Sequence, residues 1–237
     1  PPPQQQQQQQ EQEPVTSTLK YNLLSPLDNI PSAASTSRAN SIHSQNSTSD
    51  NNLKLKVKRR KLIVIGDGAC GKTSLLLNFS RGTFSEAYVP TVFESEIKRV
   101  MIERRPVDLT LFDTAGQEDF DRLRPLVYPE TDVILVCYAV DSPRTLQNVI
   151  DKWTDELRMY CRGVPFLLVG CKQDLPSELS REDGDRVCRQ IGAAGHYRCS
   201  AKTGEGVAQV FEQACRVALS QRKHTHPQRK KRSCLLQ

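Results

Sequence analysis

The chain has 237 residues, which allows one domain of ordinary size with tails or two small domains. Its formal net charge of +6 is unevenly distributed, because residues 54–61 and 222–232 each hold six basic side chains and no acidic one. Between these runs, residues 62–221 contain 19 Lys and Arg against 23 Asp and Glu. The basic character belongs to the flanks, which argues against a body that binds nucleic acid.

Eight cysteines are scattered along the chain without C-x-x-C pairing, and no secretory signal is in view. This spacing is typical of reduced thiols in a cytosolic protein and not of a disulfide or zinc framework. No apolar run approaches the ~18 residues that a membrane-spanning helix needs. We therefore predict no membrane span.

Residues 1–53 open with three prolines and seven glutamines and continue through Ser, Thr and Asn. Few of these side chains are apolar, so burial cannot offset the entropy lost on ordering, and we predict a disordered extension. Two interpretations stay open for it. It is either a phosphorylation platform or partner tether, or a dispensable tail.

Strand and helix patterns alternate through the body of the chain. The predicted strands are 61–65, 92–100, 107–112, 133–138, 165–170 and 196–199, and the predicted helices end near 79 or span 143–160, 181–191 and 207–222. Several strands are continuous apolar runs, which is typical of a parallel sheet buried on both faces. We predict an α/β fold with a doubly wound, mostly parallel six-stranded sheet flanked by helices, and a ligand outside the carboxyl ends of its strands.

The first loop of this body, from Gly66 to Thr73, matches G-x-x-x-x-G-K-[ST] between an apolar strand and a Leu-rich helix. Consecutive backbone N–H groups at a helix N-terminus bind phosphate, and Gly66, Gly68 and Gly71 leave room for it or allow positive φ. Lys72 would place its charge on the β- and γ-phosphates, and the Thr73 hydroxyl would bind Mg²⁺. The alternative is an ordinary glycine-rich turn.

A second loop, residues 112–118, follows the strand 107–112. Asp113 would lie at the strand tip and hold Mg²⁺ through water. Gly116 would offer a backbone N–H to the γ-phosphate, and Gln117 has a donor and an acceptor with which to align an attacking water. A surface amide in a mobile loop is the alternative for Gln117.

A third loop, residues 171–174, follows the strand 165–170. The Asp174 carboxylate can accept two hydrogen bonds from N1–H and the 2-amino group of guanine, a pair that adenine does not offer. The aliphatic stem of Lys172 can lie over the base. The alternative for Asp174 is a helix-capping or turn acid.

Residues 66–73, 88–94 and 113–126 together resemble the Rho family of Ras-like small GTPases, in the family's order and spacing, and the resemblance runs from about Lys61 to the C-terminus. It implies a Ras-like G domain with the P-loop NTPase fold at 54–222. It also implies a membrane-anchored molecular switch that cycles between GDP and GTP with Mg²⁺, hydrolyses GTP, and regulates the actin cytoskeleton, polarity or vesicle signalling.

The resemblance further implies roles for single residues. Thr91 would bond Mg²⁺ and the γ-phosphate, Phe84 would pack against the nucleotide, and the backbone N–H of Ala201 would meet guanine O6. Residues 84–94 and 114–127 would be the two switches, ordered by the γ-phosphate. They would contact an activating protein, an exchange factor, a dissociation inhibitor and effectors.

The predicted site residues fall into three groups. The catalytic residues are Gln117, Lys72 and Thr91, and the metal ligands are Thr73 and Thr91, with Asp113 through water. The nucleotide-binding residues are Gly66, Asp67, Gly68, Ala69, Cys70, Gly71, Lys72, Thr73, Ser74, Phe84, Tyr88, Thr91, Asp113, Gly116, Lys172, Asp174, Ser200, Ala201 and Lys202.

Three features depart from the Rho pattern. Cys171 stands where many relatives have Asn or Thr, which removes a hydrogen-bonding side chain that braces the base loop. Asp174 and Ser200 are 26 positions apart, so the usual Rho insert helix is missing, and we expect partners that need it not to bind. Phe112 replaces a Trp of many Rho members, which we expect to change the exchange factor that is accepted.

Residues 223–237 are a polybasic tail that ends in a C-a-a-X motif, with Cys234 as the lipid acceptor and a final Gln that favours farnesyl over geranylgeranyl. One lipid chain anchors weakly, and the basic cluster adds attraction to an anionic leaflet. We expect the cytoplasmic face of the plasma membrane or an endomembrane, with a cytosolic pool. A nuclear-localisation or merely solvated tail is the alternative.

Three functions compete at this stage. A GTPase switch would be slow alone, because Arg122 and Arg124 are the nearest candidates for an internal arginine finger and the family expects one from an activating protein. A GTP-binding scaffold without turnover is disfavoured by the presence of Gln117 and Gly68. An ATP-using P-loop enzyme is disfavoured by Asp174. We expect a monomer.

Overall fold

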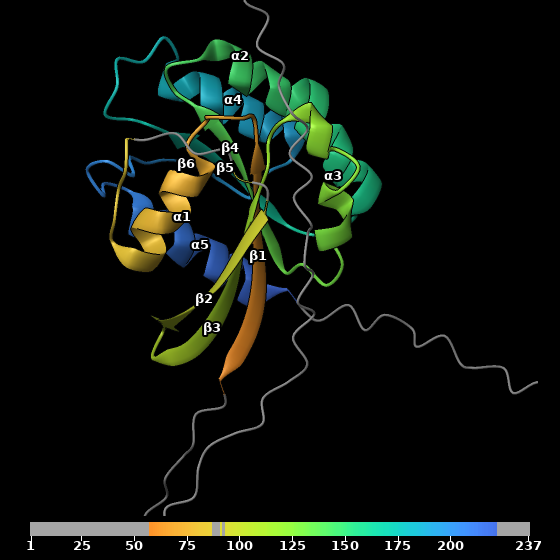
Figure 1. Cartoon of the computed structure of the whole chain (residues 1–237), viewed down its shortest axis with the longest axis vertical. Coiled ribbons are helices and arrows are strands. Elements are labelled where there is room, and N and C mark those ends of the chain that lie inside the picture. Colours follow the sequence, from red (N-terminus) through yellow and green to blue (C-terminus); the bar gives the residue numbers. More distant parts are fainter. Residues whose placement is uncertain (1–56, 87–90, 92, 222–237) are drawn as a thin grey trace, which may run out of the picture. The chain divides into compact units, whose positions relative to one another are not determined.

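The computed structural model describes residues 57–86, 91 and 93–221 (Figure 1). The chain divides into two units, 1–51 and 52–237, and every described residue belongs to the second. The predicted N-terminal extension, the basic tail with Cys234, and Tyr88 lie outside the described residues. Within the described ranges, no helix has the length and apolar character needed to cross a membrane.

Six strands form one sheet in the order β2-β3-β1-β4-β5-β6 (Figure 1). They are β1 (Lys58–Gly66), β2 (Phe93–Ile102), β3 (Arg105–Thr114), β4 (Val133–Ala139), β5 (Phe166–Cys171) and β6 (His196–Arg198). The β2–β3 pair is antiparallel, and the other four pairings are parallel. The predicted six-stranded, mostly parallel sheet is confirmed.

The central strands are apolar because both of their faces are covered. Along β1, Leu62 and Val64 pack into one core cluster, and Ile63 and Ile65 pack into the other. This alternation follows from the two-residue period of a strand. All seven residues of β4 are buried for the same reason, which explains why its sequence is a continuous apolar run.

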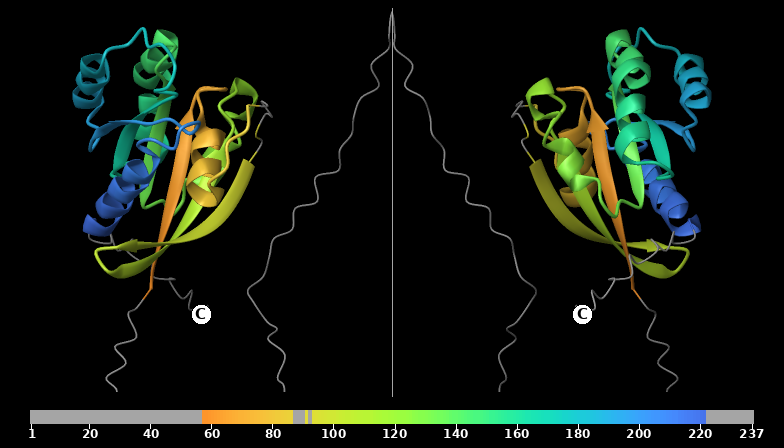
Figure 2. Two further views of the ribbon diagram at one scale, coloured as in Figure 1. Left: turned by 90° about the vertical axis from the view of Figure 1, so that its left-hand side faces the viewer. Right: turned by 90° about the vertical axis from the view of Figure 1, so that its right-hand side faces the viewer.

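Five α-helices form the two layers over this sheet (Figure 2). They are α1 (Lys72–Arg81), α2 (Pro143–Asn148), α3 (Thr154–Tyr160), α4 (Arg181–Ile191) and α5 (Val207–Ser220). Helices α1 and α5 share one core cluster, where the rings of Phe79 and Phe211 stack with centroids 3.7 Å apart. Helices α2, α3 and α4 belong to the other cluster.

The helix predicted over 143–160 is interrupted by a π-helical turn, η3 (Val149–Trp153), between α2 and α3. The backbone N–H of Thr154 bonds the carbonyl of Val149, five residues earlier, and the Thr154 hydroxyl donates to the same oxygen at 2.6 Å. The extra residue in this turn brings side chains five positions apart, Asn148 and Trp153, onto one side of the helix.

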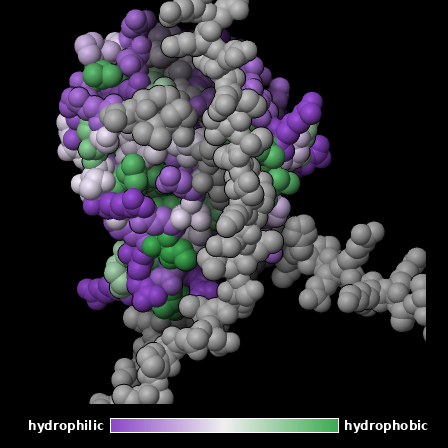
Figure 3. Space-filling model, viewed as in Figure 1, coloured by the Kyte–Doolittle hydropathy of each residue, from purple (hydrophilic) through white to green (hydrophobic). Residues whose placement is uncertain are grey.

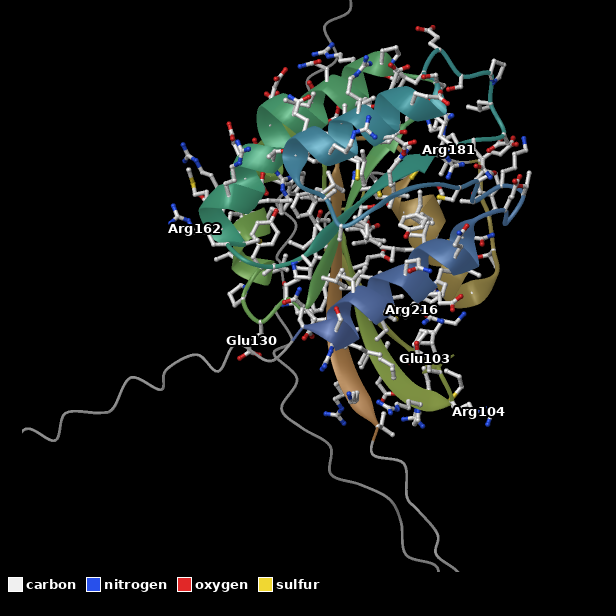
Figure 4. The ribbon with its side chains drawn as sticks, turned by 180° about the vertical axis from the view of Figure 1, so that it is seen from behind. Glu103, Arg104, Glu130, Arg162, Arg181 and Arg216 are labelled. Carbon is white, nitrogen blue, oxygen red and sulfur yellow. The ribbon has the colours of Figure 1, made fainter. Side chains whose placement is uncertain are left out.

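Two connections are compact. Glu103 and Arg104 join β2 to β3 with φ of 50° and 61°, the left-handed conformation that a two-residue hairpin requires. Arg216 of α5 lies beside this turn and pairs with Glu103 (Figure 4).

Between Asp174 and Ser200 the structure forms only α4 and β6, so no additional helix lies in this described segment.

Large exposed apolar side chains are few on the surface of the described residues. Two of them, Ile97 and Met101, lie on the edge strand β2, and Leu123 and Leu126 lie between β3 and β4. Figure 3 shows small hydrophobic areas separated by a largely hydrophilic surface. The charged side chains interspersed along β2 oppose edge-to-edge pairing of this strand.

Candidate functional site

A cavity of about 540 Å³ lies beyond the carboxyl ends of β1, β3, β5 and β6, next to the N-terminus of α1. Its size falls within the ordinary range of small-molecule sites. The predicted residues that line it are Gly68, Ala69, Gly71, Lys72, Thr73, Ser74, Phe84, Thr91, Gly116, Gln117, Lys172, Asp174, Ala201 and Lys202. Side chains and backbone from well-separated parts of the chain thus meet at the predicted edge of the sheet.

The loop between β1 and α1 depends on two glycines. Gly66 has φ 140°, and a Cβ on it would lie 2.3 Å from the carbonyl oxygen of Cys137. Gly71 has φ 107° and immediately precedes α1, whose first turn receives no side-chain cap within the described chain. The free N–H groups of this first turn are therefore available to an anion in the cavity.

Lys72 places its ammonium group inside this loop. Its Nζ donates to the carbonyl of Gly66 at 2.9 Å and to that of Asp67 at 2.6 Å, and the side chain is buried. A buried cation held among backbone carbonyls remains close to any polyphosphate that the loop surrounds.

Three oxygen-bearing side chains converge beside the cavity. Thr73 Oγ1 donates to Asp113 Oδ2 at 2.6 Å and lies 2.7 Å from Thr91 Oγ1. Asp113 is 5% exposed, burial raises its pKa, and its Oδ1 has no hydrogen-bond partner among the described residues. A buried, unpartnered carboxylate oxygen next to two hydroxyls offers the hard oxygen ligands that Mg²⁺ prefers, so these residues fit that ion.

The opposite end of the cavity is formed by the loops after β5 and β6. Ser200 Oγ donates to Asp174 Oδ1 at 2.5 Å and so joins the two loops. Asn78 of α1 donates to the carbonyl of Ala201 at 2.9 Å. Lys172 has φ 63° and points its Nζ to within 3.5 Å of Asp141 Oδ2. Polar bonds therefore fix both loops that were predicted to select the base.

Five predicted residues do not line the cavity: Gly66, Asp67, Cys70, Asp113 and Ser200. The Asp67 carboxylate accepts a hydrogen bond from Asn148 at 2.6 Å and from the indole N–H of Trp153 at 2.7 Å. Cys70 is buried, and its thiol lies 3.6 Å from the carbonyl of Cys137. The side chains of both residues therefore support the loop from outside the cavity.

The anchor of the second loop was missed at the sequence level. Arg124 is buried, donates to Glu156 at 2.7 Å and to the carbonyl of Ala115 at 2.6 Å, and lies 4.6 Å from the centre of the Trp153 ring. Its guanidinium is thus fully engaged in holding this loop. Arg122, the other candidate for an internal finger, is exposed.

The one signal for this anchor in the sequence is Trp153, the single tryptophan of the chain. Its ring contacts Arg124 of the second loop, and its N–H bonds Asp67 of the first. The π-helical turn that carries Trp153 therefore links the two loops, a connection that neither periodicity nor spacing reveals.

A glycine-rich phosphate loop, a Lys-Thr pair at a helix start and an acidic residue at a neighbouring strand tip define a nucleotide-binding α/β protein. Residues 61–220 match the Ras family. The GTP-binding protein RHO1 of Candida albicans is 50% identical over 192 residues, which cover 75% of this chain and 96% of that protein. That of Saccharomyces cerevisiae is 48% identical over 199 residues, and rho1 of Schizosaccharomyces pombe is 50% identical over 196.

These two relatives are covered to 95% and 97% of their length, again by 75% of this chain. The chain therefore belongs to the Ras family and is a small GTPase of the Rho type. The resemblance stated from the motifs is confirmed, as is its class as an enzyme that hydrolyses GTP to GDP and phosphate.

Proposed function

We propose that the cavity binds GTP and GDP together with Mg²⁺, and that loss of the γ-phosphate releases residues 84–94 and 114–127. The observation that carries this proposal is the contact of Thr91 with Thr73 at 2.7 Å beside the unpartnered oxygen of Asp113. Through Thr91 the first switch reaches the phosphate end of the site. A ligand that binds there holds this segment, and its departure frees it.

Hydrolysis would use groups already placed in the cavity. Lys72 and the N–H groups at the start of α1 would stabilise the negative charge of the transferred phosphoryl group. Bound Mg²⁺, held by Thr73 and Thr91 with Asp113 through water, would neutralise further charge there. Gln117 lines the cavity close to Gly68, since a Cβ on that glycine would lie 3.9 Å from its Cγ. Its amide would orient the attacking water.

Base choice would come from the far end of the cavity. Ser200 donates to one oxygen of Asp174, and the carboxylate would accept the N1–H and 2-amino groups of guanine. Asn78 donates to the carbonyl of Ala201, whose backbone N–H would meet guanine O6. Lys172 and Phe84 line the same cavity and would pack against the nucleotide.

Turnover would be slow without help, because Arg124 is fixed to Glu156 and Ala115 and cannot also reach the phosphates. We infer that an activating protein supplies an arginine in trans. Effectors, exchange factors and a dissociation inhibitor would also contact the two switch segments. Partners that recognise an insert helix after Asp174 would fail to bind, since the described chain has α4 alone there.

The flanking segments complete the proposal. Residues 54–222 would be the G domain, residues 1–53 a disordered extension, and residues 223–237 the membrane tail. Lipid on Cys234 and the basic cluster would hold the protein on the cytoplasmic face of an anionic membrane. Flotation of the lipidated chain with vesicles tests this part. Cys234→Ser should abolish flotation, and equal flotation of both would contradict it.

Single-turnover hydrolysis of GTP, with and without a Rho-type activating protein, tests the function itself. We expect slow hydrolysis that the activating protein accelerates. Gln117→Leu should lower the rate by about 10²-fold or more, the usual effect of losing a polar group aimed at the reacting centre. Gln190→Leu, an exposed position on α4, is the matched control and should leave the rate unchanged.

Two results would contradict the switch. Comparable rates with and without the activating protein would show that no arginine from a partner takes part in hydrolysis. Stable GTP binding without any hydrolysis would favour the alternative, a GTP-binding scaffold. Chromatography of the nucleotide released on denaturing the purified protein gives an independent answer, since guanine and not adenine nucleotide should be found.

A further inference from the structure

Three cysteines that are distant in the sequence meet under the base end of the cavity. Cys137 lies in β4, Cys171 ends β5, and Cys199 follows β6. All three are buried and unbonded, and the sulfur atoms of Cys137 and Cys199 both interact with that of Cys171. The described residues contain no group of three or more His, Cys, Asp or Glu suited to a metal ion. The chemistry of this cluster is therefore that of thiols.

The register of the sheet singles out one pair. Gly170 is paired with Arg198, and the ladder continues through a bond of 2.8 Å from the N–H of Cys199 to the carbonyl of Gly170. Cys171 and Cys199 are thus neighbours on adjacent strands, which lie ~4.8 Å apart. That separation falls within the Cα range of a disulfide, about 4.4–6.8 Å.

Cys137 is less suitable as the partner. Cys171 is paired with Ala139, so Cys137 is offset from it by two residues along β4. This diagonal places the two Cα atoms ~8 Å apart, beyond the reach of a disulfide without backbone movement. Cys171 and Cys199 also both line the cavity, which Cys137 does not.

The surroundings of Cys171 favour its reactive form. Its interactions with the thiols of Cys137 and Cys199, and the ammonium groups of Lys72 and Lys172, hold the pKa of this thiol below its usual value against the opposing effect of burial. The thiolate is the nucleophile in thiol oxidation. Cys171 is therefore the thiol of the pair that reacts first with an oxidant in the cavity.

We propose that Cys171 and Cys199 are a reversible oxidation site in the floor of the nucleotide cavity, and that their disulfide accelerates nucleotide release. The Cys171 thiolate attacks a peroxide, which breaks its O–O bond and gives a sulfenic acid and, after protonation, water. The Cys199 thiol then attacks this sulfur, the S–O bond breaks, and a second water leaves. Two thiols lose one electron each, and one peroxide gains both.

The two thiols immediately precede the loops that were proposed to hold the base. Cys171 is followed by Lys172, and Cys199 by Ser200, whose hydroxyl bonds Asp174 at 2.5 Å. A disulfide also needs its two Cβ atoms only about 3.8 Å apart, closer than the ~4.8 Å spacing of paired strands, so the strand ends that carry the two loops are drawn together when it forms. Part of the base contact is then lost, while reduction restores it.

A bound nucleotide should protect the pair, because both thiols line the cavity that it would fill. Cys171 also lies against the phosphate loop, since a Cβ on Gly71 would stand 3.0 Å from the Cβ of Cys171. Oxidation would therefore occur mainly in the nucleotide-free state. The disulfide would then prolong that open state.

The covalent step is tested by peptide mapping, which detects the disulfide without any measurement of activity. The full chain, stripped of nucleotide with a chelator, is treated with hydrogen peroxide, digested with trypsin and analysed by mass spectrometry. We expect residues 163–172 and 199–202 as one disulfide-linked pair, lost on treatment with a thiol reductant and suppressed by prior addition of GDP and Mg²⁺. Absence of this pair would overturn the proposal.

The regulatory step rests on the proposed nucleotide site and is measured as dissociation of a fluorescent GDP analogue. We expect the oxidised protein to release it about tenfold faster, the effect of losing one good hydrogen bond. Cys171→Ser and Cys199→Ser should each abolish this difference between oxidised and reduced protein. Cys215→Ala, which changes a buried thiol on α5 that does not line the cavity, is the control and should retain it.

An unchanged release rate in the linked protein, or a full response of Cys171→Ser to peroxide, would overturn the regulatory claim. Failure of the proposed function looks different. In that case no guanine nucleotide binds to the reduced protein, although peptide mapping still finds the linked pair.

Discussion

The two switch segments are held in contrasting ways. The second, residues 114–127, has a buried anchor near its end, where Arg124 binds Glu156 and the carbonyl of Ala115 and packs on Trp153. In the described part of the first, Glu86 makes an exposed ion pair with Lys202, and Thr91 reaches Thr73 and Asp113. The first segment thus depends on the phosphate end, whereas part of the second is fixed by the protein core.

Because of this contrast, we expect loss of the ligand to affect the two segments unequally. The first segment loses its buried polar contact when the groups around Thr91 rearrange. In the second, Arg124 is held by the core, so we expect Gln117 to move while this anchor stays in place. Three variants test how firmly each segment is held, and a change of pH tests a region outside both.

The largest effect is expected for Arg124→Ala. The change leaves the largely buried carboxylate of Glu156 with the Tyr128 hydroxyl as its remaining donor, and the carbonyl of Ala115 without the Arg124 donor. Breaking a buried ion pair from one side costs about 3–5 kcal/mol. Thermal unfolding measures it, with Arg122→Ala as the control, because that side chain is exposed two residues away. If both variants unfold alike, the anchor does not exist.

A smaller loss is expected for Trp153→Phe, which keeps an aromatic ring under Arg124 but removes the N–H that bonds Asp67. Removing one hydrogen-bond donor from a partly buried carboxylate lowers the free energy of unfolding by about 1–3 kcal/mol. Denaturant unfolding of this variant, of Asp67→Ala and of the double variant forms a cycle. Strictly additive losses would show that the two residues are not coupled.

Lowering the pH should destabilise the region around His196 of β6 without changing the charge of the Arg124 anchor. Burial lowers the pKa of His196, whose ring bonds Tyr138 at 2.9 Å and Asp185 at 2.8 Å. The unfolded chain therefore takes up this proton at a higher pH than the folded one, and stability falls as the pH drops through 6.5, the ordinary pKa of a histidine.

Unfolding free energies between pH 7.5 and about pH 5.5 measure this loss. His196→Gln keeps a donor and an acceptor but cannot titrate, so its stability should vary less over this range. The charge of Arg124 persists throughout, because its carboxylate partners raise its pKa against the effect of burial. An identical pH profile for both proteins would exclude His196 as the source.

The smallest effect is expected for Lys202→Ala, which removes the ion pair with Glu86. Both side chains are exposed, and such pairs contribute about 0–1 kcal/mol. Unfolding should therefore barely change. A loss as large as that of Arg124→Ala would mean that the first segment is anchored as firmly as the second, which would remove the contrast.

The sequence predicts the sheet and the cavity edge well because these follow from local patterns. Apolar runs place β4 and β5 inside, and Lys72, Asp113 and Asp174 follow strand ends that parallel pairing brings together. The ends of the two hairpin strands, β2 and β3, were predicted less accurately. The prediction of 92–100 and 107–112 omits residues 105, 106, 113 and 114 of β3, which are polar or proline and interrupt the apolar pattern. It also omits Met101 and Ile102 of β2, which are apolar and immediately precede the hairpin turn.

Features that depend on side-chain geometry between distant elements could not be predicted in this way. The Asp67 carboxylate was assigned with the phosphate loop, yet its partners Asn148 and Trp153 meet it only because a π-helical turn puts them on one side. The scattered cysteines indicated reduced thiols. Only the strand register shows that Cys171 and Cys199 are neighbours.

The stacking of Phe79 on Phe211 has a consequence for synthesis on the ribosome. Helix α5 supplies much of one core cluster, including Val210, Phe211 and Ala214. Until it has left the exit tunnel, the faces of α1 and β1 that it covers stay open to water. Until α5 emerges, the nascent chain therefore exposes apolar surface that favours aggregation.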